Sequence, residues 1–199
     1  MLYRKLGKTD CEVSVLGFGC MRLPLQHGLE RATDIFDPMK PIDEEQAIAM
    51  IHHAIGNGVN YFDTAYPYHG GQSESLLGKA MSGYRDKVLL ATKSPIWMIE
   101  GAIDFDRFLD EQLEKLKSYY VDFYLLHGLS RQSWHRMKEL GALDFLDKIR
   151  ADGRARYVGF SFHDDVGIFK DIVSDESTPA PLRRVMAGGL MYLIRQFDL

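Results

Sequence analysis

Three ionisable side chains, Asp63, Lys93 and His127, each stand directly after an apolar run that is typical of a β-strand. Tyr68 follows Asp63 by five residues and lies on the loop that leaves the same run. In barrels and open parallel sheets, the carboxyl ends of neighbouring strands meet at one rim, where active sites are built. We therefore expect these four side chains to converge on one rim.

Side chains of these four types suit the donation of a proton to an oxygen that gains negative charge. A lysine beside a tyrosine hydroxyl favours the phenolate and lowers the tyrosine pKa from about 10. An aspartate would pair with the lysine, and a histidine would orient a carbonyl oxygen or share the proton. Taken singly, Asp63 also fits a turn residue, Lys93 a solvated strand end and His127 a core histidine. Their joint occurrence on successive strands favours the functional interpretation.

The elements that would position these residues alternate along the chain. Five short apolar runs are predicted to be strands: Val15–Gly19, Asn60–Thr64, Lys87–Thr92, Val121–Leu126 and Ala155–Phe160. None of them alternates cleanly between polar and apolar residues. This pattern is typical of strands that are buried on both faces in a parallel sheet.

Segments with helical spacing of apolar residues separate the strands. The predicted helices are Asp43–Asn57, Ser73–Met81, Asp104–Tyr119, Ser133–Ala151 and Asp164–Val173. The repeated order of strand and helix indicates an α/β protein with a parallel sheet, and it fits an eightfold barrel or a doubly wound sheet equally well. Two further runs, Leu2–Lys5 and Glu12–Ser14, predict a β-hairpin before the first strand.

Several segments together resemble the aldo-keto reductases. The most specific one is Gly58–Ala65, followed by Tyr68 and by the motif Ser73-Glu74-x-x-Leu77-Gly78. Further similar segments are Lys5–Thr9, Val13–Gly19, Ala91–Lys93, Tyr124–His127 and Gly153–Ser161. The similarity runs from about Leu2 to Val173. Two segments, Tyr66–Gly71 and Phe160–Asp164, look most like a bacterial and archaeal branch whose longer members carry a C-terminal iron–sulfur segment.

The resemblance implies a (β/α) TIM-barrel fold, here an incomplete barrel with an N-terminal β-hairpin and about five of the eight strand–helix units. It also implies an NAD(P)H-dependent oxidoreductase that reduces the carbonyls of small aldehydes or ketones by hydride transfer. Tyr68 would be the general acid, and Lys93 would tune its pKa. Asp63 would pair with Lys93, and His127 would orient the carbonyl.

The cofactor that the resemblance implies is NADPH. The residues expected beside it are Gly19, Cys20, Met21, Arg22, Asp63 and Ser161. Phe162 stands where the family commonly has an asparagine. In the family, the segments that bind the pyrophosphate and the adenosine follow the seventh and eighth strands, and nothing after Val173 resembles them. We therefore expect a chain truncated after its fifth unit that binds NADPH weakly, with neither a metal nor an iron–sulfur cluster.

Composition argues against several other classes of protein. The chain has 199 residues, of which 46% are hydrophobic and 26% charged, as in ordinary globular domains. A net charge of −4 leaves no basic excess for nucleic acid. No apolar run approaches the ~20 residues that span a bilayer, and the charged segment Met1–Asp10 does not resemble a signal peptide. Cys11 and Cys20 form no disulfide framework, so we expect a cytoplasmic protein.

The chain divides into a barrel portion, residues 1–173, and a divergent tail, residues 174–199. Apolar residues at helical spacing predict a helix over Leu182–Leu199 in the tail. Five strands cannot close a barrel of eight, so the first and fifth strands should have unpaired edges. We expect the tail helix to cover this opening, or the chain to self-associate through it.

Two alternatives remain open from the sequence. The chain could be a catalytically impaired fragment or a non-catalytic member of the same family, which keeps the four residues but binds the cofactor weakly. It could also be a metal-dependent hydrolase barrel with Asp63, His127 and His163 as ligands, although no H-x-H strand motif supports this. Trp97 and Trp134 would either line a substrate mouth or pack in the interior.

Overall fold

The computed structural model describes residues 1–7, 9–28 and 31–175, and its central feature is a parallel five-stranded sheet. The strands are β3 (Phe18–Gly19), β4 (Tyr61–Asp63), β5 (Leu89–Ser94), β6 (Val121–Leu129) and β7 (Ala155–Phe162). Their spatial order follows the chain, β3-β4-β5-β6-β7. A doubly wound sheet reverses its order at a switch point, so this sequential order indicates part of a (β/α) barrel.

The edges of the sheet are β3 and β7. Within the described residues, each of these two strands pairs with one neighbour, as expected for five of a barrel's eight strands. The predicted helix Leu182–Leu199, and with it the expected cover over the opening, lies outside the described residues.

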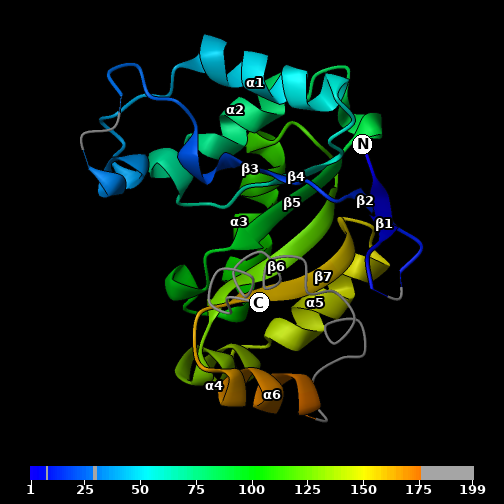
Figure 1. Cartoon of the computed structure of the whole chain (residues 1–199). Helices are drawn as coiled ribbons and strands as arrows, with labels where there is room; N and C mark the ends of the chain where they lie inside the picture. The colour runs from blue at the N-terminus through cyan, green and yellow to red at the C-terminus, as the bar shows by residue number, and fades with distance from the viewer. Residues whose placement is uncertain (8, 29–30, 176–199) are drawn as a thin grey trace.

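Helices follow the strands and pack against the sheet (Figure 1). They are α1 (Glu44–Gly56), α2 (Ser73–Ala80), α3 (Ala102–Lys115), α4 (Arg131–Glu139), α5 (Ala142–Ala151) and α6 (Val166–Ser174). Short 3₁₀ turns span Cys20–Arg22, Ala32–Phe36, Tyr68–Gly71, Arg85–Lys87 and Ile96–Met98. The larger core lies between helices and sheet, where strand residues such as Phe62, Leu90 and Leu126 are fully buried. Among the described helices, none combines the length and hydrophobicity that crossing a membrane requires.

The predicted hairpin is present and lies at the amino ends of the strands (Figure 1). Its strands are β1 (Tyr3–Lys5) and β2 (Glu12–Ser14). The Ser14 N–H donates to Asn60 Oδ1 at 2.8 Å, and Asn60 Nδ2 donates to the Glu12 carbonyl at 3.0 Å. Because Asn60 directly precedes β4, these bonds fix the hairpin at the end of the sheet opposite to the predicted site.

Several predicted boundaries were wrong. The segment predicted as one helix, Ser133–Ala151, forms α4 and α5, because Gly141 adopts a left-handed φ of 86° that no helix continues through. The predicted end of α3 at Tyr119 is too late, because Lys117 also turns left-handed, at φ 50°. The first strand is shorter than Val15–Gly19 and spans only β3.

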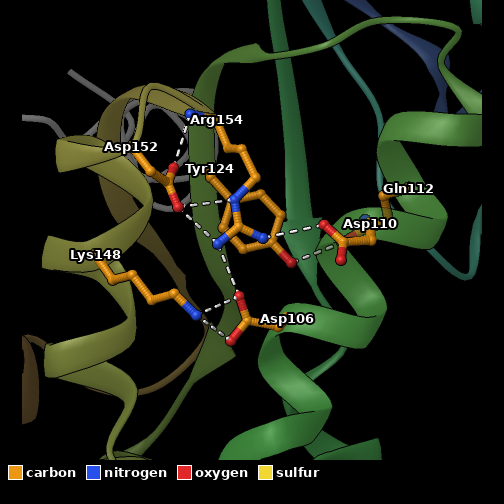
Figure 2. A network of polar contacts seen from close by, with 7 residues as sticks. All are labelled: Asp106, Asp110, Gln112, Tyr124, Lys148, Asp152 and Arg154. Atoms are coloured by element: carbon orange, nitrogen blue, oxygen red, sulfur yellow. Dashed lines mark hydrogen bonds and ion pairs between the residues drawn. The ribbon is translucent and has the colours of Figure 1, made fainter.

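An ionic network centred on Arg154 ties α3 and α5 to the start of β7 (Figure 2). The Arg154 guanidinium contacts Asp106 at 2.7 Å, Asp110 at 3.0 Å and Asp152 at 2.8 Å. Lys148 reaches Asp106 from α5 at 2.8 Å. Several of these groups are partly exposed, so the network contributes orientation more than stability.

The α2–α3 contact depends on Gly78 in the motif Ser73-Glu74-x-x-Leu77-Gly78. A Cβ at this position would lie 2.5 Å from the Lys115 carbonyl oxygen and 2.7 Å from the backbone carbon of Leu116. Both obstacles are backbone atoms, which cannot rotate away. The glycine therefore allows the two helices to approach closely enough to seal this part of the core.

We predict that Gly78→Ala lowers the free energy of unfolding by about 1–3 kcal/mol, because the two helices must separate. Gly56→Ala in α1 is the matched control, since a Cβ there meets nothing within 4 Å. That substitution should stabilise the protein by up to about 1 kcal/mol. Urea denaturation of both variants measures the difference, and equal stability of Gly78→Ala and wild type would contradict the proposed close contact.

Candidate active site

Alternation along the strands brings the predicted site residues to one face of the sheet. Tyr61, Ala91 and Leu125 belong to one small apolar cluster on the face turned away from the main core. Asp63, Lys93 and His127 each follow one of these cluster residues by two positions. Since side chains repeat every second residue in a strand, all three project from the same face at the carboxyl ends of β4, β5 and β6.

Lys93 is the centre of the site. Its side chain is nearly inaccessible, with the residue 4% exposed. The ammonium donates to Asp63 Oδ1 at 2.6 Å, to the Thr64 carbonyl at 2.7 Å and to the Tyr68 hydroxyl at 3.4 Å. Burial alone would lower the pKa of Lys93, but the charges of Asp63 and Tyr68 raise it above its ordinary value. Lys93 is therefore a permanent cation at neutral pH.

Tyr68 and His127 complete the group. The two rings meet edge to face, with centroids 6.0 Å apart and an angle of 83° between their planes. The Tyr68 residue is 6% exposed, and the Lys93 ammonium lies 5.0 Å from the centre of its ring. The half-exposed Trp97 also contacts His127, at 5.3 Å between ring centroids. The structure thus brings all four predicted side chains together.

The His127 imidazole is neutral in this setting. Burial, the Lys93 charge and His163 together lower the pKa of His127 to about 3. The strand is irregular here, because the β6–β7 register shifts between Leu126 and Leu129 and Gly128 has a positive φ of 67°. Such bulges commonly re-aim a side chain beside a site. No local sequence pattern indicates this bulge, and β6, which was predicted to end at Leu126, extends to Leu129.

A strained turn carries Tyr68. The next residue, His69, adopts a left-handed φ of 53° and is fully buried. Its Nε2 accepts a hydrogen bond from the Leu23 N–H at 3.0 Å, which requires that this nitrogen carry no proton. A Cβ on Gly70 would lie 2.5 Å from Pro38 Cα, so the turn is also pressed against a second loop. His69 was not predicted to be a site residue, although the two glycines after it indicate a turn.

The segment predicted to lie beside a cofactor begins at Gly19. The backbone of Gly19 pairs with Asp63 across β3 and β4, and the turn Cys20–Arg22 follows directly. A Cβ at Gly19 would meet nothing within 4 Å, so the backbone faces open space there. Cys20 is buried, and burial raises the pKa of its thiol, whereas Arg22 is exposed and Met21 is half-buried.

Ser161 lies on β7, the sheet edge opposite to β3, and is buried next to Gly128 of β6. Its hydroxyl oxygen accepts a hydrogen bond from the Gly128 N–H at 2.7 Å. Phe162 projects from the other side of the strand and packs against Phe160 and Phe169, with ring centroids 6.5 Å and 5.5 Å away. The structure therefore does not place Ser161 and Gly19 next to each other.

The metal-site alternative is not supported by the geometry. Among residues 1–7, 9–28 and 31–175, no group of three or more His, Cys, Asp or Glu side chains is arranged to hold a metal ion. The Asp63 carboxylate is occupied by Lys93 instead.

Trp134 is buried, and its Nε1 donates to Asp175 at 3.3 Å, so this tryptophan packs in the interior.

Sequence comparisons match the chain to known proteins. The profile of the Aldo/keto reductase family matches residues 15–184. A probable aldo-keto reductase from soybean is 34% identical over 166 residues, which cover 79% of this chain and 44% of that protein. L-galactose dehydrogenase from Arabidopsis thaliana is 32% identical over 175 residues, which cover 79% and 47% of the two chains. The chain spans about half the length of the curated relatives it matches.

Solved structures show the same relationship. An aldo-keto reductase from Bacillus halodurans, in its holo form, superposes with a TM-score of 0.67 at 27% identity and covers 87% of this chain and 54% of that one. The aldo/keto reductase from Klebsiella pneumoniae in complex with NADP and acetate gives a TM-score of 0.61 at 25% identity, over 83% and 51% of the two chains. The five-stranded sheet is therefore part of a (β/α) barrel, as predicted, and the chain belongs to the aldo/keto reductase family.

Proposed function

We propose that this chain carries the proton-transfer side of an NADP(H)-dependent reductase site that acts on the carbonyls of small aldehydes or ketones. The observation that carries the proposal is the buried Lys93 ammonium between Asp63 and Tyr68, at 2.6 Å and 3.4 Å. A fixed cation beside a phenol favours the phenolate and so makes the hydroxyl a better proton donor. Family membership supports oxidoreductase chemistry.

Tyr68 is the proposed general acid. When a carbonyl carbon is reduced, its oxygen gains negative charge and needs a proton from a group held within hydrogen-bond distance. The Tyr68 hydroxyl can supply this proton, and Lys93 then stabilises the phenolate that remains. Asp63 balances the lysine charge and fixes its direction. Because Lys93 stays charged at neutral pH, the proton that moves is the one on Tyr68.

His127 is the proposed orienting group for the carbonyl. A neutral imidazole can donate one hydrogen bond to an oxygen without placing a second full charge beside Lys93. Its edge-to-face contact with Tyr68 puts the two side chains on the same side of the site. Trp97, whose ring lies 5.3 Å from the imidazole between centroids, would supply an apolar wall for the substrate.

The residues present fit the nicotinamide end of the cofactor. Gly19–Arg22 would lie beside it with Asp63, and the open space at Gly19 leaves room for a close approach of the backbone. The Ser161 hydroxyl oxygen accepts from Gly128, so its own proton remains available for an amide oxygen. A bound NADPH would supply the hydride to the carbonyl carbon.

A catalytically impaired chain is the second candidate, and it is favoured by the position of the cofactor residues. Gly19 and Ser161 lie on the two edge strands, β3 and β7, each of which has one strand partner within the described residues. Weak hold on the cofactor would lower the rate even with an intact Tyr68 group, because positioning supplies much of the rate enhancement.

We predict that Tyr68→Phe lowers the turnover of a small aromatic aldehyde by about 10²-fold or more, because only the proton donor is removed. The fold should persist, since the ring still packs against His127. Tyr66→Phe is the matched control, because its hydroxyl bonds to Glu111 at 3.1 Å, outside the site. Turnover is followed by NADPH absorbance; a Tyr68→Phe variant that keeps more than about a tenth of wild-type turnover rules out the general-acid role.

We predict that the His127 ring does not titrate between about pH 5 and 8. Its pKa is about 3 in the folded protein against 6.5 for an ordinary histidine, so the unfolded chain takes up this proton first as the pH falls. The contribution of His127 to stability is therefore complete above pH 6.5 and is lost as the pH falls toward 3. Histidine NMR signals, assigned with His127→Gln, measure this; an inflection near 6.5 would contradict it.

We predict that NADPH binds this chain with a Kd weaker than about 100 μM, against the micromolar range that a complete site can reach. The cofactor residues proposed here, Gly19–Arg22, Asp63 and Ser161, would contact the nicotinamide end. Fluorescence titration with NADPH measures the affinity, and Ser161→Ala should weaken it further. A low-micromolar Kd for the wild-type chain would instead show that the cofactor site is complete.

A further inference from the structure

The first turn of α2 directs two buried polar side chains toward the ends of three strands. Ser73 lies fully inside the protein, and its Oγ donates to the Cys20 carbonyl at 3.1 Å while sharing a 2.9 Å hydrogen bond with Thr64 Oγ1. Ser73 therefore connects the turn after β3 with the end of β4. Its neighbour Glu74 also lies in the first turn of α2 and is fully buried.

Glu74 accepts hydrogen bonds from side chains on β5 and α3. One carboxylate oxygen, Oε1, accepts from Thr92 Oγ1 at 2.6 Å and from Gln112 Nε2 at 2.6 Å. Burial raises the pKa of Glu74, and the two hydrogen bonds only partly oppose this effect. A buried carboxylate is unfavourable unless strong hydrogen bonds compensate it, so its presence here calls for a reason other than filling space.

Gln112 joins this carboxylate to the backbone of Lys93. The side chain is fully buried on α3, and its Nε2 also donates to the Lys93 carbonyl oxygen at 3.0 Å. Its Oε1 accepts from the Tyr124 hydroxyl at 2.8 Å (Figure 2). These partners set the orientation of the Gln112 amide. A flipped amide would turn its oxygen toward the Glu74 carboxylate and the Lys93 carbonyl, which are both acceptors.

Two neighbouring residues of β5 thus make hydrogen bonds on the two opposite faces of the strand. Thr92 faces Glu74 on the helix side, while Lys93 projects to the opposite face and meets Asp63 and Tyr68. We propose that Glu74 and Gln112 are positioning residues for Lys93: by fixing the Thr92 side chain and the Lys93 carbonyl, they set where the ammonium lies. This inference rests on the proposed function for its catalytic meaning, but the placement of Lys93 can be tested without turnover.

The signature of a positioned ammonium is its slow hydrogen exchange. A buried lysine that donates three hydrogen bonds should give a protected Nζ signal in a ¹⁵N spectrum near neutral pH, whereas exposed lysines exchange their protons too fast to be seen. The signal is assigned by its loss in Lys93→Arg. Gln112→Met keeps the side-chain length but removes the N–H that bonds to the Lys93 carbonyl.

We expect Gln112→Met to speed the hydrogen exchange of the Lys93 ammonium by about tenfold or more. The variant removes the buried hydrogen bond to the Lys93 carbonyl, and the loss of one such bond corresponds to a change of about this size. Tyr124→Phe is the matched control, since it removes a buried bond to Gln112 but leaves the bond to Lys93 in place. This control should change the exchange rate of the Lys93 signal less than about twofold, even if it lowers the melting temperature as much as Gln112→Met does. Equal effects of the two variants would overturn the proposal.

A second variant keeps the test decisive if Gln112→Met does not fold. The pair Glu74→Met with Gln112→Met replaces both buried partners by apolar side chains of similar size, a change that proteins often tolerate. A folded double variant with a wild-type Lys93 signal would show that the pair acts only in packing. A folded double variant that loses the protected signal supports positioning.

Turnover separates this inference from the proposed function. Suppose that the wild-type chain reduces aldehydes and Tyr68→Phe does not. Gln112→Met should then lower kcat by about tenfold or more while KM changes little, because a displaced Lys93 ammonium impairs proton transfer from Tyr68 and leaves substrate binding unaffected. If the chain shows no turnover, the proposed function fails, while the exchange result for Lys93 still decides whether Glu74 and Gln112 position it.

Discussion

Lys93 places an ammonium group where the residue is only 4% exposed, and a buried cation requires partners that replace water. Asp63 supplies the countercharge and accepts one hydrogen bond from the ammonium. The Thr64 carbonyl oxygen accepts a second hydrogen bond, and the Tyr68 hydroxyl oxygen accepts a third. These bonds require that β4 end beside β5 in the observed register and that the following loop return to the site. The left-handed turn at His69 provides that return.

Strand alternation couples this inner arrangement to the helix layer. Lys93 and Thr92 are neighbours in sequence, so their side chains leave β5 on opposite faces. A shift of β5 that moved Lys93 away from Asp63 would also break the bond from Thr92 to Glu74 and the bond from Gln112 to the Lys93 carbonyl. The motif Ser73-Glu74-x-x-Leu77-Gly78 thus acts from behind the sheet, with Gly78 bringing α3 and its Gln112 close enough to α2.

The sequence predicted the features that depend on local order and failed where the cause was a distant contact. The strand ends at Asp63, Lys93 and His127 could be found because an apolar run ending in an ionisable residue is visible in one segment. The bulge after His127 depends on the bond between Gly128 and Ser161, 33 residues apart, which no local pattern shows. The contacts of Glu74 are not visible locally either: its partners Thr92 and Gln112 lie on β5 and α3, 18 and 38 residues away.

The two halves of the proposed chemistry depend on barrel closure to different degrees. Tyr68, Lys93 and His127 come from three consecutive units around β4, β5 and β6, which pair directly with one another. Their geometry is therefore set inside the described sheet. Gly19 and Ser161 lie on β3 and β7, and the separation of two edge strands depends on how strongly the sheet between them curves. In the proposed function, the geometry for proton transfer would accordingly be set by local strand pairing, whereas the geometry for cofactor binding would depend on barrel closure.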